Sequence, residues 1–151
     1  MAAIIAHVAR EAGLTVRTIR RDCVASCGPL GGVLTALKRS SAGSVLFLAC
    51  DMPFISADML RELVKAAGRR RTVFARSGPG VGFPFVLPVS SACLIEQQIK
   101  KGELSLQELA RKMKGTKLRL DRKWPAELQN VNTPFKYRQA TKRWSKRRTK
   151  K

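Results

Sequence analysis

The stretch Val45-Leu46-Phe47-Leu48-Ala49-Cys50-Asp51-Met52-Pro53 decides the fold class of this 151-residue chain. Its apolar run, 45–50, is typical of a strand buried on both faces of a parallel sheet, so we expect an interior parallel strand there. Asp51 follows at once, and ligands of open α/β sheets bind outside the carboxyl ends of the strands. A carboxylate at this place suits Mg²⁺, a hard cation that prefers oxygen ligands and substrate phosphates. On this stretch alone, an aspartate that only caps the following turn is an equal alternative.

Helix and strand patterns alternate on both sides of this stretch. Apolar periodicity and capping residues predict helices over 2–12, 29–39, 56–67, 91–102 and 106–113, and a closing helix from Thr133-Pro134. Strands are expected over 14–19, 72–75, 85–89 and 117–120, with a glycine-rich loop over 77–82. Strands that alternate with short helices predict an α/β domain with a mostly parallel sheet.

The composition indicates one folded domain without a membrane span. Apolar residues make up 44% of the chain and charged residues 26%, which is enough apolar material for a core. No apolar run approaches the roughly 20 residues that a membrane helix needs, so no membrane association is expected. The four cysteines do not resemble a disulfide framework. A reducing, cytoplasmic location is therefore expected.

The net charge of +20 is unevenly distributed. Residues 1–135 contain 21 basic and 10 acidic residues, whereas residues 136–151 contain nine basic residues and no acidic one. We therefore expect a domain over 1–135 and a basic, disordered tail over 136–151. Such a tail attracts polyanions without sequence preference and with a strong salt dependence. A solvated extension without a dedicated partner is the alternative.

Two further motifs lie where an α/β sheet binds ligands. Gly28-Pro29-Leu30-Gly31-Gly32 stands between a strand candidate and a helix start, where glycines allow a ligand close to the backbone and the helix N-terminus favours anions. In Asn130-Val131-Asn132-Thr133-Pro134, alternate side chains of an extended segment would present two amides to one face. A tight turn and a polar turn, respectively, are the structural alternatives.

Taken together, these three motifs resemble the molybdenum cofactor guanylyltransferase family over roughly residues 13–138. The resemblance implies a three-layer, Rossmann-like nucleotidyltransferase domain that transfers GMP from GTP to molybdopterin, with Mg²⁺, and releases pyrophosphate. It implies that Asp51 is the catalytic residue and binds both metal and nucleotide. It further implies that Asp22 and Gly28 contact the nucleotide and that Asn130 and Asn132 bind the molybdopterin side.

The family's first strand and its glycine-rich LAGGxSxRMGxDK loop have no counterpart in this sequence. We therefore expect a domain that is truncated at its N-terminus, lacks the central strand of its sheet and transfers little GMP alone. Two other functions stay open on the sequence. One is a related transferase that uses CTP or a sugar phosphate, and the other is a non-catalytic basic protein that binds nucleic acid through its tail.

Overall fold

The computed structural model describes residues 2–24, 26–68, 71–77, 80–120, 123–124, 126–131, 133 and 138. The helices are α1 (Ala2–Glu11), α2 (Gly28–Lys38), α3 (Ala57–Ala67), α4 (Ala92–Lys100) and α5 (Leu106–Lys112), with a 3-10 turn η1 (Val89–Ser91) before α4. The strands are β1 (Ser44–Phe47), β2 (Val73–Ser77), β3 (Gly80–Pro88) and β4 (Thr116–Leu118). The expected closing helix and the basic tail lie outside the described residues, apart from Thr133 and Arg138.

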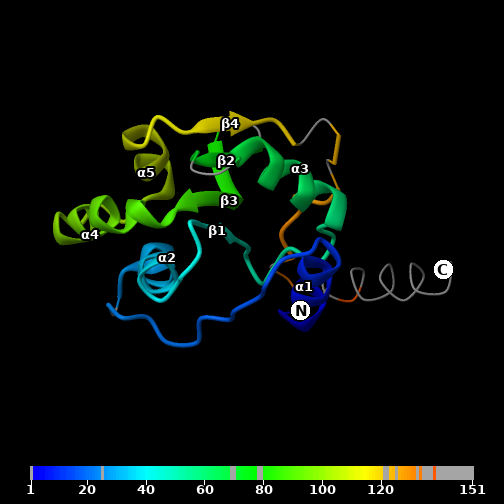
Figure 1. Cartoon of the computed structure of the whole chain (residues 1–151), viewed down its shortest axis with the longest axis horizontal. Coiled ribbons are helices and arrows are strands. Elements are labelled where there is room, and N and C mark those ends of the chain that lie inside the picture. Colours follow the sequence, from blue (N-terminus) through cyan, green and yellow to red (C-terminus); the bar gives the residue numbers. More distant parts are fainter. Residues whose placement is uncertain are drawn as a thin grey trace, which may run out of the picture.

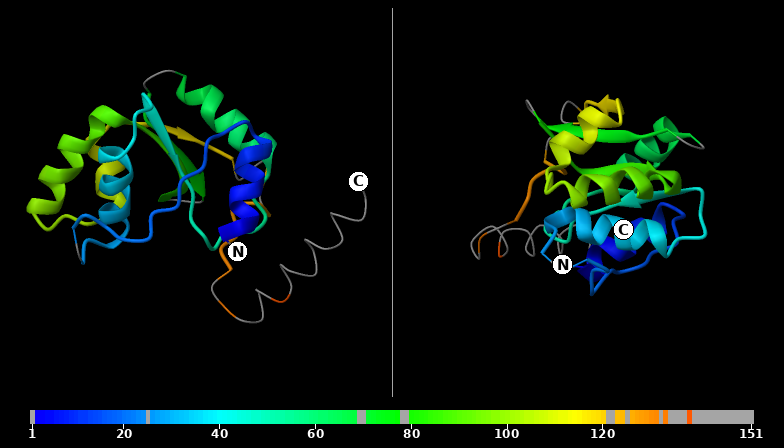
Figure 2. Two further views of the ribbon diagram at one scale, coloured as in Figure 1. Left: turned by 60° about the horizontal axis from the view of Figure 1, so that its bottom comes forward. Right: turned by 90° about the vertical axis from the view of Figure 1, so that its left-hand side faces the viewer.

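The elements form three layers, with helices on both faces of one sheet (Figures 1 and 2). One face carries α1 and α3, and its buried residues are Val8, Ala9, Ile55, Met59, Leu60, Leu63, Ala67, Val73, Ala75, Val86 and Leu120. The other face carries α2, α4 and α5, and its buried residues are Leu30, Val33, Leu34, Leu37, Phe47, Phe74, Phe85, Leu87, Ile95, Leu109 and Ala110. Successive strand residues point to opposite faces, so β1, β2 and β3 each contribute to both cores, whereas β4 contributes Leu118 to the α1–α3 core alone. The predicted α/β class is confirmed.

The sheet, however, is mostly antiparallel, so the predicted direction of its strands is wrong. The strand order is β1-β3-β2-β4, and only the β2–β4 pair is parallel. Only two positions separate β2 from β3 in the chain, and strands with so short a connection pair antiparallel. The loop expected over 77–82 is accordingly shorter, since β2 extends to Ser77 and β3 begins at Gly80.

The strand predicted over 45–50 is an edge strand rather than an interior one. It spans Ser44–Phe47 and pairs antiparallel with β3, with Val45 opposite Leu87 and Phe47 opposite Phe85. The apolar run extends past the strand because Leu48, outside the ladder, packs on the α1–α3 core. An apolar run reports burial, not the direction of the neighbouring strand.

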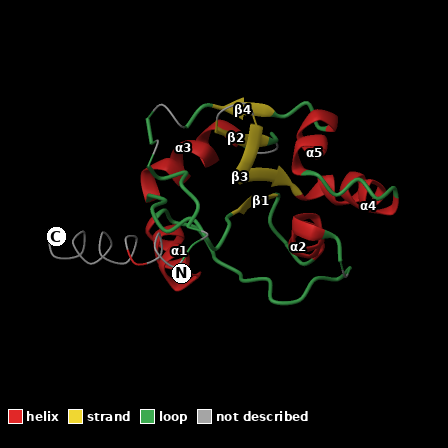
Figure 3. Ribbon diagram, turned by 180° about the vertical axis from the view of Figure 1, so that it is seen from behind, coloured by secondary structure: helices red, strands yellow, loops and turns green. Residues whose placement is uncertain are grey.

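The strand predicted over 14–19 is an irregular, extended segment without a ladder. Its side chains alternate over 14–17, with Leu14 and Val16 partly buried and Thr15 and Arg17 exposed, but the alternation breaks at Thr18, which is also exposed. It belongs to the long connection between α1 and α2, which runs on the β1 side of the sheet (Figure 3). A strand forms only where a neighbour takes its backbone hydrogen bonds, and no strand of the described residues pairs with this segment.

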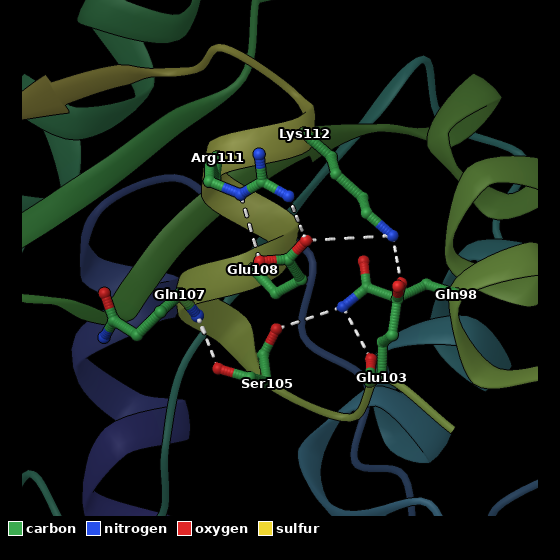
Figure 4. Close-up of polar contacts among 7 residues, drawn as sticks. All are labelled: Gln98, Glu103, Ser105, Gln107, Glu108, Arg111 and Lys112. Atoms are coloured by element: carbon green, nitrogen blue, oxygen red, sulfur yellow. Dashed lines mark hydrogen bonds and ion pairs between the residues drawn. The ribbon is translucent and has the colours of Figure 1, made fainter. Parts of the chain in front are cut away.

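A compact group of polar side chains braces the turn between α4 and α5 (Figure 4). The Nε2 of the buried Gln98 donates to the carbonyls of Glu103 and Ser105, at 2.7 and 3.1 Å. The charged members neutralise one another, since Lys112 pairs with Glu103 and Glu108 with Arg111. The group is therefore a structural brace for α5.

Candidate functional site

The loop that follows β1 presents Asp51 at the surface of the apolar core. Met52 and Ile55 are buried behind it, and the Asp51 side chain itself is partly buried. Its Oδ1 is inaccessible to solvent and has no hydrogen-bond partner within the described residues. An unpaired buried carboxylate oxygen is costly unless a ligand satisfies it. This oxygen is therefore the best candidate metal ligand in the described chain.

A backbone hydrogen bond brings the asparagine segment to Asp51. The amide of Val131 donates to the carbonyl oxygen of Asp51 at 2.8 Å. Asn130, the preceding residue, is exposed beside this contact, whereas Asn132 lies outside the described residues. Two motifs nearly 80 positions apart in the sequence thus meet at this hydrogen bond.

The segment before Asn130 is anchored on the core and on α3. Leu120 is fully buried, and Trp124 and Leu128 pack against the α1–α3 core. Glu127 accepts hydrogen bonds from the amide and the hydroxyl of Ser56, at 3.1 and 2.6 Å. Glu127 belongs to none of the sequence motifs. The available signal was that it is the only acidic residue after Asp121 in a strongly basic region.

The second group of candidate residues surrounds the first turn of α2. The Asp22 carboxylate lies against this turn, with Oδ2 2.9 Å from the position that a Cβ on Gly31 would occupy. Its Oδ1 lies 3.4 Å from the corresponding position on Gly32. Only a residue without a side chain at position 31 allows this approach. The close approach of Asp22 therefore explains why a glycine stands at position 31, which the motif alone did not show.

Thr35 joins the loop that carries Asp22 to α2. The Thr35 hydroxyl donates to the carbonyl of Gly31 and accepts from the amide of Cys23, both at 2.7 Å. The Thr35 side chain is fully buried, so its bond to Gly31 is shielded from water, whereas the bond from Cys23 is only partly buried. Sequence patterns did not reveal this residue, because a threonine inside an apolar helix carries no site signature.

Gly28 begins α2 with a backbone conformation that favours glycine. Its φ is +53°, and nothing lies within 4 Å of the position of an added Cβ. The N-cap residue, Cys27, gives the helix no side-chain capping bond. The backbone at Gly28 is thus approachable, and a helix N-terminus favours an anion there.

The structure therefore brings the candidates together in two groups. Asp51 stands with Asn130, and Asp22 stands with Gly31 at the start of α2, close to Gly28 in the chain. A common site for the two groups stays a prediction. Within the described ranges no three side chains of His, Cys, Asp or Glu gather as a metal site. A cation at Asp51 would thus draw most of its ligands from water or from a bound phosphate.

Residues 3–118 match the sequence model of the MobA-like NTP transferase domain. The chain belongs to this family. It is 33% identical to a probable molybdenum cofactor guanylyltransferase from Flavobacterium johnsoniae over 74% of this chain and 60% of that protein. It is 30% identical to a molybdenum cofactor guanylyltransferase from Pseudomonas syringae over 85% of this chain and 65% of that protein. The chain thus spans less than two thirds of the length of these two curated relatives.

A solved structure supports the same fold. The molybdopterin-guanine dinucleotide biosynthesis protein A from Archaeoglobus fulgidus superimposes with a TM-score of 0.65 and 20% identity, over 79% of this chain and 64% of that one. The chain therefore adopts the fold of the MobA-like nucleotidyltransferases, as the sequence predicted. None of the helices in the part that the structure describes has the length and apolar character that crossing a bilayer requires.

Proposed function

We propose that this chain forms the nucleotidyltransferase part of a molybdenum cofactor guanylyltransferase and contributes to the transfer of GMP from GTP to molybdopterin. The observation that carries the proposal is the buried Oδ1 of Asp51, which has no hydrogen-bond partner among the described residues and lies beside the segment that bears Asn130. The names of the curated relatives support the choice of nucleotide and acceptor. The proposed reaction releases pyrophosphate.

Asp51 fits a role as the ligand of Mg²⁺. Its Oδ1 is a hard oxygen donor that no described side chain uses. When bound, Mg²⁺ would supply charge stabilisation at the phosphates of the nucleotide. The protein's own contribution is to hold the carboxylate in place, since the Val131 amide fixes the backbone of Asp51. Such positioning and charge placement account for most of the catalysis in phosphoryl chemistry.

The remaining candidates divide between the two substrates. Gly28 offers an open backbone at the N-terminus of α2 for the nucleotide, and Asp22, beside the same turn, offers acceptor oxygens for its hydrogen-bond donors. Asn130 would present an amide, with both donor and acceptor groups, to molybdopterin. Asn132 is proposed for the same substrate from the sequence motif alone.

The test compares nucleotides and acceptors on the full chain. Calorimetry with Mg²⁺ should show GTP bound at least about tenfold more tightly than CTP, a difference of about 1.4 kcal/mol. Equal affinities would contradict the assignment to guanylyl transfer and favour the CTP alternative. Incubation with labelled GTP and molybdopterin then reports the dinucleotide product directly.

We also propose the division of the chain into a domain over 1–135 and a basic extension over 136–151. The nine basic residues of that extension, without an acidic one, support non-specific contact with polyanions. The small number of cysteines, four in 151 residues, supports a cytoplasmic location.

A further inference from the structure

Glu127 is a buried carboxylate that no candidate motif contains. Only 9% of its surface is exposed, and its Oε2 accepts from both the amide and the hydroxyl of Ser56. The Ser56 oxygen in turn accepts from the amide of Met59, at 3.2 Å, and so caps α3. Because the Ser56 proton points to Glu127, its lone pairs face the helix. Glu127 therefore orients the cap as well as holding the loop.

The contacts of Glu127 and Val131 connect two facing stretches of chain at both of their ends. Asp51 and Ser56 stand at the start and end of a short loop, and Glu127 and Val131 stand at the start and end of the facing segment. Glu127 holds Ser56, while the Val131 amide holds the Asp51 carbonyl. Asn130 lies between these attachment points. Its distance from Asp51 thus depends on how the loop and the segment are aligned.

We propose that Glu127 is a positioning residue that sets the alignment of Asn130 with Asp51. This inference rests on the proposed function, because it gives Asn130 a place on the acceptor side. Glu127 touches neither reactant in this arrangement. It acts through Ser56, which fixes the end of the Asp51 loop, and through the short segment that leads to Val131.

Simple tethering of the C-terminal segment does not require Glu127. Trp124 and Leu128 already pack on the core, and Lys123 forms an exposed ion pair with Glu62 of α3, at 2.9 Å. The Glu62 pair also connects the segment to α3, but at the surface and farther along the chain from Asn130. Glu62→Ala is therefore a matched control that removes a link between the same two elements.

The experiment measures the exchange of the Val131 amide in the full chain by NMR. Glu127→Ala should accelerate its exchange by about tenfold or more, the factor that a loss of 1.4 kcal/mol in local opening free energy produces. The amide of Val86, within β3, should be unaffected. Glu127→Gln keeps an oxygen acceptor for Ser56 and should retain protection, as should Glu62→Ala. If Glu127→Ala fails to fold, Glu127→Asp, which is one methylene shorter, should give an intermediate acceleration.

Binding measurements on the same variants distinguish a loss of alignment between Asn130 and Asp51 from a general loss of structure. Molybdopterin affinity should fall about tenfold in Glu127→Ala, as in Asn130→Ala, while GTP affinity in the presence of Mg²⁺ should change less than about twofold. Unchanged Val131 exchange would overturn the inference, and so would unchanged molybdopterin affinity where Asn130→Ala weakens it. If Asn130→Ala has no effect, the proposed acceptor role fails, and with it the role of Glu127 in acceptor binding. The exchange data still report whether Glu127 aligns the segment.

Discussion

The Asp22 carboxylate touches the backbone face of Gly31, with Oδ2 at 2.9 Å from the place of a missing Cβ. The next helix position behaves differently, because a Cβ on Gly32 would meet Oδ1 at an ordinary contact distance of 3.4 Å. Two neighbouring glycines of one motif thus have different physical roles. One admits a carboxylate, and the other has room for a methyl group.

We expect Gly31→Ala to displace Asp22 without unfolding the protein. A methyl group would lie 2.9 Å from the flexible Asp22 carboxylate and 3.0 Å from the backbone carbonyl oxygen of Val24, so the loop that carries both residues must shift slightly. Alanine improves helix propensity by up to about 1 kcal/mol, which offsets part of this cost, so the net stability change should stay within about that amount. Asp22 should move, which the chemical shift of its carboxyl carbon reports, and GTP affinity should fall. Gly32→Ala shares the propensity gain and should leave Asp22 in place. Equal shifts of Asp22 in both variants would contradict the steric argument.

We expect Thr35→Val to destabilise the fold by about 1–3 kcal/mol, because it removes the partner of the Cys23 amide and leaves that donor unsatisfied. Thr35→Ser retains the hydroxyl and should recover most of the loss, apart from one buried methyl group worth about 1 kcal/mol. Urea denaturation checks both values. A valine variant as stable as the serine variant would show that the two hydrogen bonds at 2.7 Å carry little net free energy.

We expect Asp51→Asn to weaken the binding of GTP in the presence of Mg²⁺ by about tenfold, since an amide oxygen is a poorer ligand for a hard cation than a carboxylate. Chelation of the metal should abolish the difference between the two proteins. Asp58→Asn is the control, because Asp58 is exposed and pairs with Arg61 on α3. Calorimetry with and without EDTA gives the four affinities. A difference that persists in EDTA would assign Asp51 to the nucleotide rather than to the metal.

The ion pair between α2 and α4 predicts a pH-dependent contribution to stability. Lys38 donates to Glu96 at 3.0 Å, and this bond lowers the pKa of the Glu96 carboxyl below its ordinary value of 4.5. A lowered carboxyl pKa means that the stabilisation is complete above pH 4.5 and is lost as the pH falls through the lower, folded-state pKa. Glu96→Gln should therefore differ from the parent only above this range, and only slightly, since the pair is exposed.

A carboxyl titration by NMR measures this shift directly. Lys38→Met should return the pKa of Glu96 toward its ordinary value, because the hydrogen bond from Lys38 is the largest cause of the shift. A Glu96 pKa that is unaffected by this substitution would show that the pair does not persist in solution.

The sequence predicted the local elements better than their pairing. Ser56 caps α3 as expected because a serine before an amphipathic run acts within one turn of helix. The direction of β1 was missed because an apolar run does not encode which strand lies beside it. The extended segment over 14–19 has the alternation of a strand only over 14–17 and no ladder in the described sheet.

For the candidate site, too, the sequence predicted local features better than long-range contacts. Asp51 could be selected because a carboxylate directly after an apolar strand has a local pattern. Its Oδ1 is buried and has no partner in the part of the chain that the structure describes. Glu127 and Thr35 could not, because their significance depends on Ser56 and Cys23, which lie 71 and 12 positions away in the chain. Residues that hold a site through other residues leave no spacing pattern of their own.

The two cores on opposite faces of the sheet have a consequence for how the sequence can vary. Phe74 and Phe85 share a face with ring centroids 5.4 Å apart, so their substitutions should show epistasis, with energies that do not add. Val73 precedes Phe74 directly but belongs to the other core. Substitutions at these two adjacent positions should add almost independently. Each face can therefore diverge in evolution with compensations drawn from its own helices, while the opposite face keeps its composition.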